Sequence, residues 1–229
     1  MRGTWPNPGL PYYNDGVLEA GFTSPLWMAF GALAHVISFT SGLSPVLIIK
    51  MLGIFLAWLT SVAIFELCRH FTDHLISAVL CGLYVATLPA IAFSQVSGMG
   101  VCLASCLSGW AILCLFQNRS LSCGILLGLG IITRPENVIL SVLVVISVLL
   151  WGSSRSHLTK LNRVLRLLLP TAVLLLLWSF ACFLITGHPL PNTYYAKFSS
   201  FDIIGGFGRI LSEVVLKMPA MFLFSVILL

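Results

Sequence analysis

Long apolar runs separated by short polar interruptions make up most of the chain. The interruptions contain glycine, proline, serine, asparagine and charged residues, which commonly end helices. Apolar runs of this length indicate helices. We therefore predict an all-α protein with apolar segments at about 25–40, 45–68, 75–93, 99–117, 121–133, 137–152, 164–186 and 215–229.

Most of these segments approach the length of a membrane-spanning helix, which needs roughly 20 apolar residues. The pattern predicts a polytopic transmembrane helical bundle of about seven spans and one further juxtamembrane or re-entrant helix. We divide the chain into residues 1–44, an external loop with the juxtamembrane helix, and residues 45–229, a transmembrane bundle with an external loop at 187–214.

The composition supports a membrane protein. Of 229 residues, 59% are hydrophobic and 8% are charged, and the mean hydropathy is +1.04. A water-soluble domain carries about a quarter charged residues, so the chain is predicted to be an integral membrane protein. The net charge of +5 does not predict nucleic-acid binding, because the few basic residues fall in loops where membrane topology explains them.

The cysteines point to packing rather than to chemistry. All seven lie within or at the ends of apolar segments, and none forms a CxxC pair. We expect them to act as small apolar side chains between helices and predict no metal site.

Lysine and arginine set the expected orientation. Residues 153–166 carry four basic residues and no acidic one, so this loop is predicted to be cytoplasmic. Counting spans from there places Arg119 inside and Arg134 outside. The polar stretch "HPLPNTYYAK", residues 188–197, is also outside.

The segment at 25–40 decides where the N-terminal arm lies. Its length of about 16 residues is short for a span, so we expect it to lie along the external surface or to re-enter, with its axis strongly inclined to the bundle. Ser24 and Pro25 form a typical helix start. Trp27 and Phe30 would then lie at the headgroup level.

Two external segments carry candidate binding residues. In "TRPEN", residues 133–137, the preceding apolar stretch is short, so Arg134 and Glu136 are predicted to lie below the surface in a protein-lined cavity; the alternative is that they cap a hairpin and meet headgroups. The second segment is the polar stretch at 188–197. It offers amide, hydroxyl, phenol and ammonium groups that suit a sugar and a phosphate. The alternative there is an interfacial aromatic belt. Its candidates are Asn192, Thr193, Tyr194, Tyr195 and Lys197.

The N-terminal arm supplies two acidic residues, Asp15 and Glu19. Either carboxylate could act as a general base, and the alternative is that both are merely solvated.

Four blocks occur in order between the helices: "YNDGVLEAGFTSPLW", "SGM", "GLGIITRPE" and "PLPNTYYAK". In this order they resemble polytopic GT-C glycosyltransferases, most of all the group that includes the mycobacterial terminal arabinofuranosyltransferase. The resemblance implies transfer of a sugar from a polyprenyl-phosphate donor to a cell-envelope glycan, lipid or protein acceptor. It also implies an active face on the outside of a bacterial cytoplasmic membrane and a juxtamembrane helix in the first loop. It predicts no cofactor besides the lipid-linked donor and leaves a metal requirement open.

The chain departs from the family pattern at three places. Gly100 stands where the family has an acidic residue after Ser-Gly-Met. The family's first transmembrane helix and its acidic pair have no counterpart, and the chain stops within an apolar run. We therefore expect an N- and C-terminally incomplete or diverged member. The alternative is a non-enzymatic membrane protein: an inactive glycosyltransferase remnant, a scaffold or a transporter-like bundle.

Overall fold

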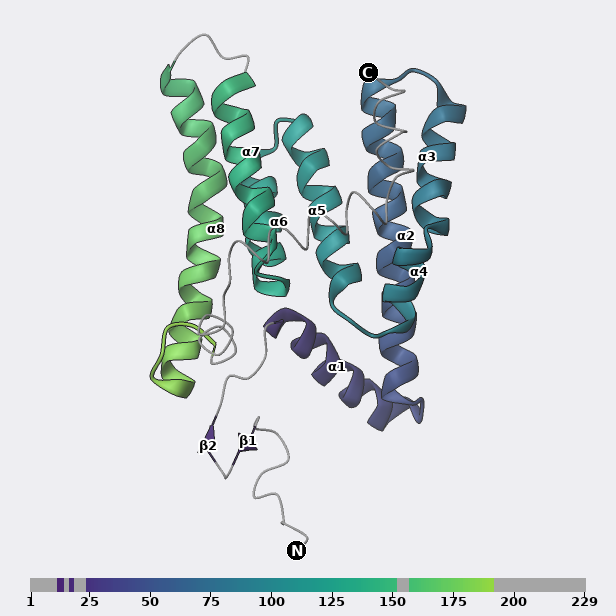
Figure 1. Ribbon diagram of the computed structural model, residues 1–229, viewed down its shortest axis with the longest axis vertical. Coiled ribbons are helices and arrows are strands. Elements are labelled where there is room, and N and C mark those ends of the chain that lie inside the picture. The colour runs from purple at the N-terminus through teal and green to yellow at the C-terminus, as the bar shows by residue number, and fades with distance from the viewer. Residues whose placement is uncertain (1–11, 15–16, 19–23, 152–156, 192–229) are drawn as a thin grey trace, which may run out of the picture.

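The computed structural model describes residues 12–14, 17–18, 24–151 and 157–191 (Figure 1). Within these ranges the chain is mostly helical, as predicted, with one short antiparallel hairpin that the sequence pattern did not indicate. The elements are β1 (Tyr12–Asn14), β2 (Val17–Leu18), α1 (Pro25–Ser41), α2 (Pro45–Phe71), α3 (Leu75–Thr87), α4 (Pro89–Val96), α5 (Val101–Phe116), α6 (Ser120–Thr133), α7 (Asn137–Trp151) and α8 (His157–Thr186).

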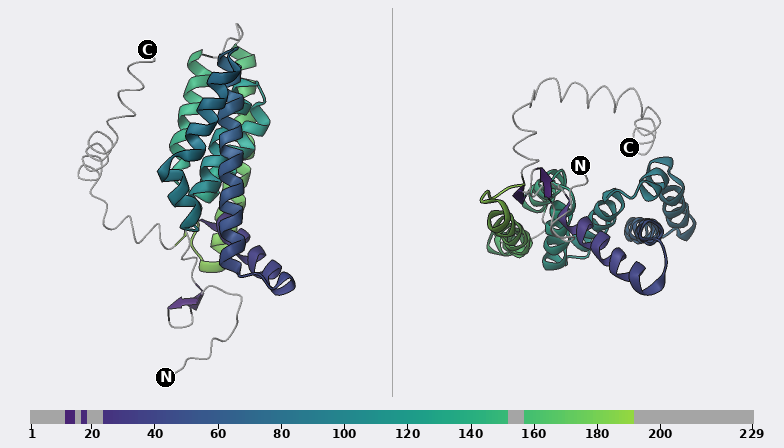
Figure 2. Two further views of the ribbon diagram at one scale, coloured as in Figure 1. Left: turned by 90° about the vertical axis from the view of Figure 1, so that its right-hand side faces the viewer. Right: turned by 90° about the horizontal axis from the view of Figure 1, so that it is seen from below.

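The long helices stand side by side, and α1 lies across one end of them (Figures 1 and 2). Neighbouring contacts run from α3 to α2, then to α5, α6 and α8, and α7 packs against α5, α6 and α8. We call the end that α1 crosses the α1 end. The turn at 97–100, the turn at 134–136 and the segment at 187–191 lie at this end. The predicted external loops therefore share one end of the bundle, as far as they are described.

The opposite end, which we call the far end, holds the turns at 72–74 and 117–119 (Figure 1). The axis of α1 is strongly inclined to the bundle (Figure 1), which agrees with the predicted inclination of this segment. Pro25 occupies the first turn of α1, as expected, but the Ser24 side chain makes no capping hydrogen bond.

Among the described residues, two helices are long and apolar enough to cross a membrane: α2 and residues Lys160–Thr186 of α8. Five others in the described part of the chain are apolar but only 10–17 residues long. The predicted seven spans are thus not confirmed. Large apolar side chains cover the outside of the bundle, and on α8 Leu169, Leu176 and Leu184 are each 66–69% exposed. Such surfaces and such helices are typical of a membrane protein.

Two predicted boundaries were wrong. The segment at 75–93 is broken, because Leu88 precedes a proline and adopts an extended conformation with ψ 123°; α4 starts anew at Pro89. The basic segment at 153–166 is not a loop throughout, since α8 begins at His157. Leucine, lysine and arginine are good helix formers, and Val164 is buried against neighbouring helices.

The interior consists of two apolar clusters. One joins α5, α6, α7 and α8 around Leu127 and Leu167, and the other joins α1, α2 and α5 around Leu56 and Leu103. The packing role predicted for the cysteines is confirmed for the five buried ones, which are Cys102, Cys106, Cys114, Cys123 and Cys182.

The closest helix contact lies between α6 and α8. A methyl group added at Gly124 would overlap the carbonyl oxygen of Leu167 and lie 2.7 Å from Cγ of Pro170. One added at Gly128 would lie 3.1 Å from Cα of Thr171. The Thr171 hydroxyl also donates to the Gly124 carbonyl oxygen at 2.8 Å. The glycines at a spacing of four residues therefore form a face on which α8 packs closely.

Candidate functional site

Three segments far apart in the sequence meet at the α1 end. The indole Nε1 of Trp27, in α1, donates to the carbonyl oxygen of Gly98 at 2.8 Å. A Cβ added at Gly100 would lie 3.2 Å from Cβ and Cγ of Trp27 and 3.6 Å from Cγ2 of Thr133. The start of α1, the turn at 97–100 and the end of α6 are therefore in contact.

The local sequence explains the contact with Trp27. Gly98 has a φ of 67°, a conformation that suits glycine and turns the chain between α4 and α5. Gly100 lacks a side chain where the indole ring passes, and it is buried. The ring of Trp27 packs with Leu26 and Phe30 against the cluster around Leu56 and Leu103.

Trp27 and Phe30 are both half-buried against the protein. That they lie at the headgroup level stays a prediction. A buried indole N–H needs an acceptor, and the carbonyl oxygen of Gly98 meets that need.

Arg134 lies directly after this contact, in the turn between α6 and α7. Because it precedes Pro135, its backbone is extended, with φ −147° and ψ 119°, and α6 ends there. Its N–H still donates to the carbonyl oxygen of Gly130 at 2.8 Å. Among the described residues, its side-chain Nε is the buried polar atom that has no hydrogen-bond partner.

Asn137 fixes the turn that carries Arg134. Its side-chain Nδ2 donates to the carbonyl oxygen of Gly130 at 3.1 Å, and its backbone N–H donates to the Arg134 carbonyl oxygen at 3.0 Å. A side chain at Gly130 would crowd Asn137, since the added Cβ would lie 3.0 Å from Nδ2. The turn is therefore held at both ends by hydrogen bonds.

Glu136 is exposed at the same turn, so its position is nearer to the alternative in which it caps the hairpin. Its carbonyl oxygen accepts from the N–H of Ile139 at 3.1 Å, which helps to start α7. Arg134 is half-buried, and between the two alternatives for this hairpin its position is nearer to the protein-lined one.

The remaining predicted site residues lie outside the described residues. They are Asp15, Glu19, Asn192, Thr193, Tyr194, Tyr195 and Lys197. The structure nevertheless describes the segments that lead to them. The hairpin β1–β2 flanks Asp15, and residues 187–191 follow α8 at the α1 end (Figure 1).

Sequence reasoning missed the roles of Trp27, Gly100 and Asn137 in building this end of the bundle. A tryptophan at the start of an apolar helix is equally typical of an interfacial residue, so its pattern did not reveal the acceptor at Gly98. The pairing of Asn137 with Gly130 spans seven residues, whereas the usual asparagine turn motif links the side chain to backbone two residues on, so the sequence carried no signal for it.

The geometry at Arg134 suits the binding of an anion. A guanidinium with a buried, unpaired N–H is a donor for an anionic oxygen. Within the described ranges, no group of three or more histidine, cysteine, aspartate or glutamate side chains is placed to hold a metal ion.

Comparison with known proteins finds no matching family model, no similar curated protein and no similar solved structure.

Proposed function

We propose that the chain is the membrane core of a GT-C-like glycosyltransferase. In this proposal it transfers a sugar from a polyprenyl-phosphate donor to a cell-envelope glycan, lipid or protein acceptor. The support is that three of the four sequence blocks, those containing Trp27, Gly98 and Arg134, meet at one end of the bundle. The fourth block starts from the segment that follows α8 at that same end (Figure 1).

The observation that carries the proposal is the unpartnered Nε of Arg134. Leaving a buried donor unsatisfied costs about 1–3 kcal/mol, and more for a charged group. Such an atom calls for a partner that the described residues do not supply. A phosphate oxygen is the natural acceptor for a guanidinium, which binds it through parallel hydrogen bonds.

The reaction would be a displacement at the anomeric carbon. A carboxylate removes the proton of the acceptor hydroxyl, the hydroxyl oxygen bonds to the anomeric carbon, and the bond to the lipid phosphate breaks. Arg134, with Lys197 as its proposed partner, would neutralise the charge that builds up on the leaving phosphate. Asp15 and Glu19 are the proposed bases, and the aromatic and polar residues from Asn192 to Tyr195 would contact the sugar.

We place the α1 end outside a bacterial cytoplasmic membrane. Arg119, Arg163 and Arg166 lie toward the far end, whereas Arg134 lies at the α1 end. An excess of arginine and lysine is typical of the cytoplasmic side.

Donor binding to the detergent-solubilised protein tests this function. We expect Arg134→Gln to weaken binding of a polyprenyl-phosphate sugar about ten- to a hundredfold, because a charge-assisted contact contributes about 1.5–3 kcal/mol. Arg134→Lys should recover only part of this loss, since an ammonium cannot form the paired contact of a guanidinium. Lys197→Ala should weaken binding similarly.

Arg69→Gln is the matched control, because it removes the same charge from the far end of α2. Equal affinity in the wild type and in all Arg134 and Lys197 variants would contradict the donor site. That outcome would favour the alternative, a non-enzymatic membrane bundle.

A further inference from the structure

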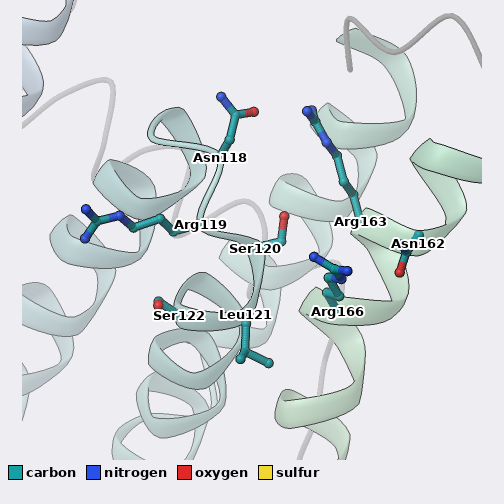
Figure 3. A pocket seen from close by; sticks show the side chains of 8 residues that line it. All are labelled: Asn118, Arg119, Ser120, Leu121, Ser122, Asn162, Arg163 and Arg166. Carbon is teal, nitrogen blue, oxygen red and sulfur yellow. The ribbon is translucent and has the colours of Figure 1, made fainter.

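A pocket of about 500 Å³ opens at the far end of the bundle. It lies between the turn that joins α5 to α6, the first turn of α6 and the start of α8 (Figure 3). Its lining is polar and basic except for one leucine. The lining residues are Asn118, Arg119, Ser120, Leu121, Ser122, Asn162, Arg163 and Arg166.

The charge of this pocket is one-sided. Three arginines line it, and none of the other described lining residues is acidic. Arg163 and Arg166 project from α8 toward the α5–α6 turn, whereas the side chain of Arg119 extends away from α8 (Figure 3). A concave site lined by charge of one sign concentrates ions of the other sign, so the pocket favours an anion.

The start of α6 adds donors to the same space. The first N–H groups of a helix have no acceptor within it, and the residue before α6, Arg119, makes no side-chain cap. Ser120, Leu121 and Ser122 form this first turn and line the pocket. Free N–H groups and the helix dipole favour a phosphate at such a position.

One exposed apolar side chain belongs to the lining, and others lie outside it on α8. Leu121 lines the pocket and is 55% exposed. Leu165 and Leu169 do not line the pocket and are 55% and 66% exposed. A small soluble anion would gain nothing from exposed leucines beside its site. A ligand that joins a phosphate to hydrocarbon chains would use both surfaces, and basic pockets between membrane helices are known to hold anionic headgroups.

We propose that this pocket binds the headgroup of an anionic phospholipid. The phosphate contacts Arg163, Arg166 and the N–H groups that begin α6. The hydroxyl groups of the headgroup contact Asn118, Asn162 and the serines, while the acyl chains run along the exposed leucines. The site lies at the opposite end from Arg134 and does not depend on the proposed glycosyltransferase function.

Binding of short-chain lipids to the full chain in neutral detergent tests the proposal. The probe is dihexanoyl phosphatidylglycerol, and dihexanoyl phosphatidylcholine, glycerol 3-phosphate and inorganic phosphate are titrated in parallel. We expect phosphatidylglycerol to bind most tightly. We expect Arg163→Gln and Arg166→Gln to weaken its binding about tenfold each, and the double variant about a hundredfold.

Arg69→Gln is the control for a general loss of charge, because Arg69 belongs to α2 and does not line the pocket. It should leave the affinity unchanged. Equal weakening by Arg69→Gln, or unchanged affinity in the Arg163 and Arg166 variants, would overturn the site. Glycerol 3-phosphate or inorganic phosphate binding as tightly as the lipid would overturn the assignment to a lipid and indicate a soluble phosphate ligand. If the double variant aggregates, the single variants decide the question.

Discussion

Trp27 joins two segments that are 71 residues apart in the sequence, because its indole donates to the carbonyl oxygen of Gly98. Gly98 lies in the turn between α4 and α5. Its carbonyl oxygen is therefore not part of the regular hydrogen bonding within a helix. The residue thereby fixes where α1 lies relative to the turn between α4 and α5.

Trp27→Phe should therefore destabilise the protein. The ring loses its donor and leaves the Gly98 carbonyl oxygen without this partner, which should lower the free energy of unfolding by about 1–3 kcal/mol. Thermal or denaturant unfolding in detergent measures the change. Trp58→Phe is the control, because Trp58 is 59% exposed and should have little effect. Equal stability of the two variants would contradict the role assigned to Trp27.

Arg134 shows how far a single residue could be predicted. Its charge next to a proline, after a short apolar stretch, marked it as a candidate, and the structure places its Nε in a buried position. Glu136, two residues away, carried the same prediction and is exposed. Spacing in the sequence could not separate them, because the direction of each side chain depends on how the turn at 134–136 folds against α6.

At the scale of helices, the close packing of α6 against α8 requires a glycine at position 124. Gly124→Ala should destabilise this pair, because the added methyl overlaps the backbone of α8 at Leu167, and overpacking of this kind costs about 1–3 kcal/mol. The melting temperature in detergent measures the effect.

Gly31→Ala is the matched control for Gly124→Ala. It lies inside α1, and an added Cβ there would meet no atom within 4 Å. Since alanine is a better helix former than glycine by about 0.5–1 kcal/mol, this variant should be as stable as the wild type or more stable. If Gly31→Ala were destabilised and Gly124→Ala unaffected, the close packing of α8 on α6 at Gly124 would be contradicted.

Helix positions followed from the apolar runs, whereas some boundaries did not. Apolar character continues through Leu88, so hydropathy gave no sign of the break that Pro89 imposes on the backbone before it. The start of α8 was missed for a different reason. Its first turns are basic and therefore resemble a loop in composition. Their helical conformation depends on the burial of Val164 and Leu167 against neighbouring helices.

At the scale of the whole molecule, the two ends of the bundle should face opposite sides of the membrane. In a cysteine-free background, Glu136→Cys should react with an impermeant thiol reagent in intact cells, because Glu136 is exposed at the α1 end. Gln117→Cys, which is exposed at the far end and does not line the pocket, should react only after permeabilisation. Labelling of Gln117→Cys from outside, with protection of Glu136→Cys, would invert the proposed orientation.

The arrangement of the loops was predictable because alternate turns of an up-and-down bundle must fall at alternate ends. The packing order was not. Sequence alone did not show that α8 would contact α6 so closely, or that the arginines expected in a loop would line a pocket on α8. These features arise from side chains on separate helices, and hydropathy along one chain carries little information about such pairs.

The contact between α6 and α8 also affects the order in which the chain folds during its synthesis. The surface of α6 that carries Gly124 and Gly128 is complementary to α8 between Leu167 and Leu174, and α7 is synthesised between them. A nascent α6 therefore leaves the ribosome well before its principal partner exists. Its mature position can be reached only once α8 has been synthesised, so this part of the bundle assembles late in the folding of the chain.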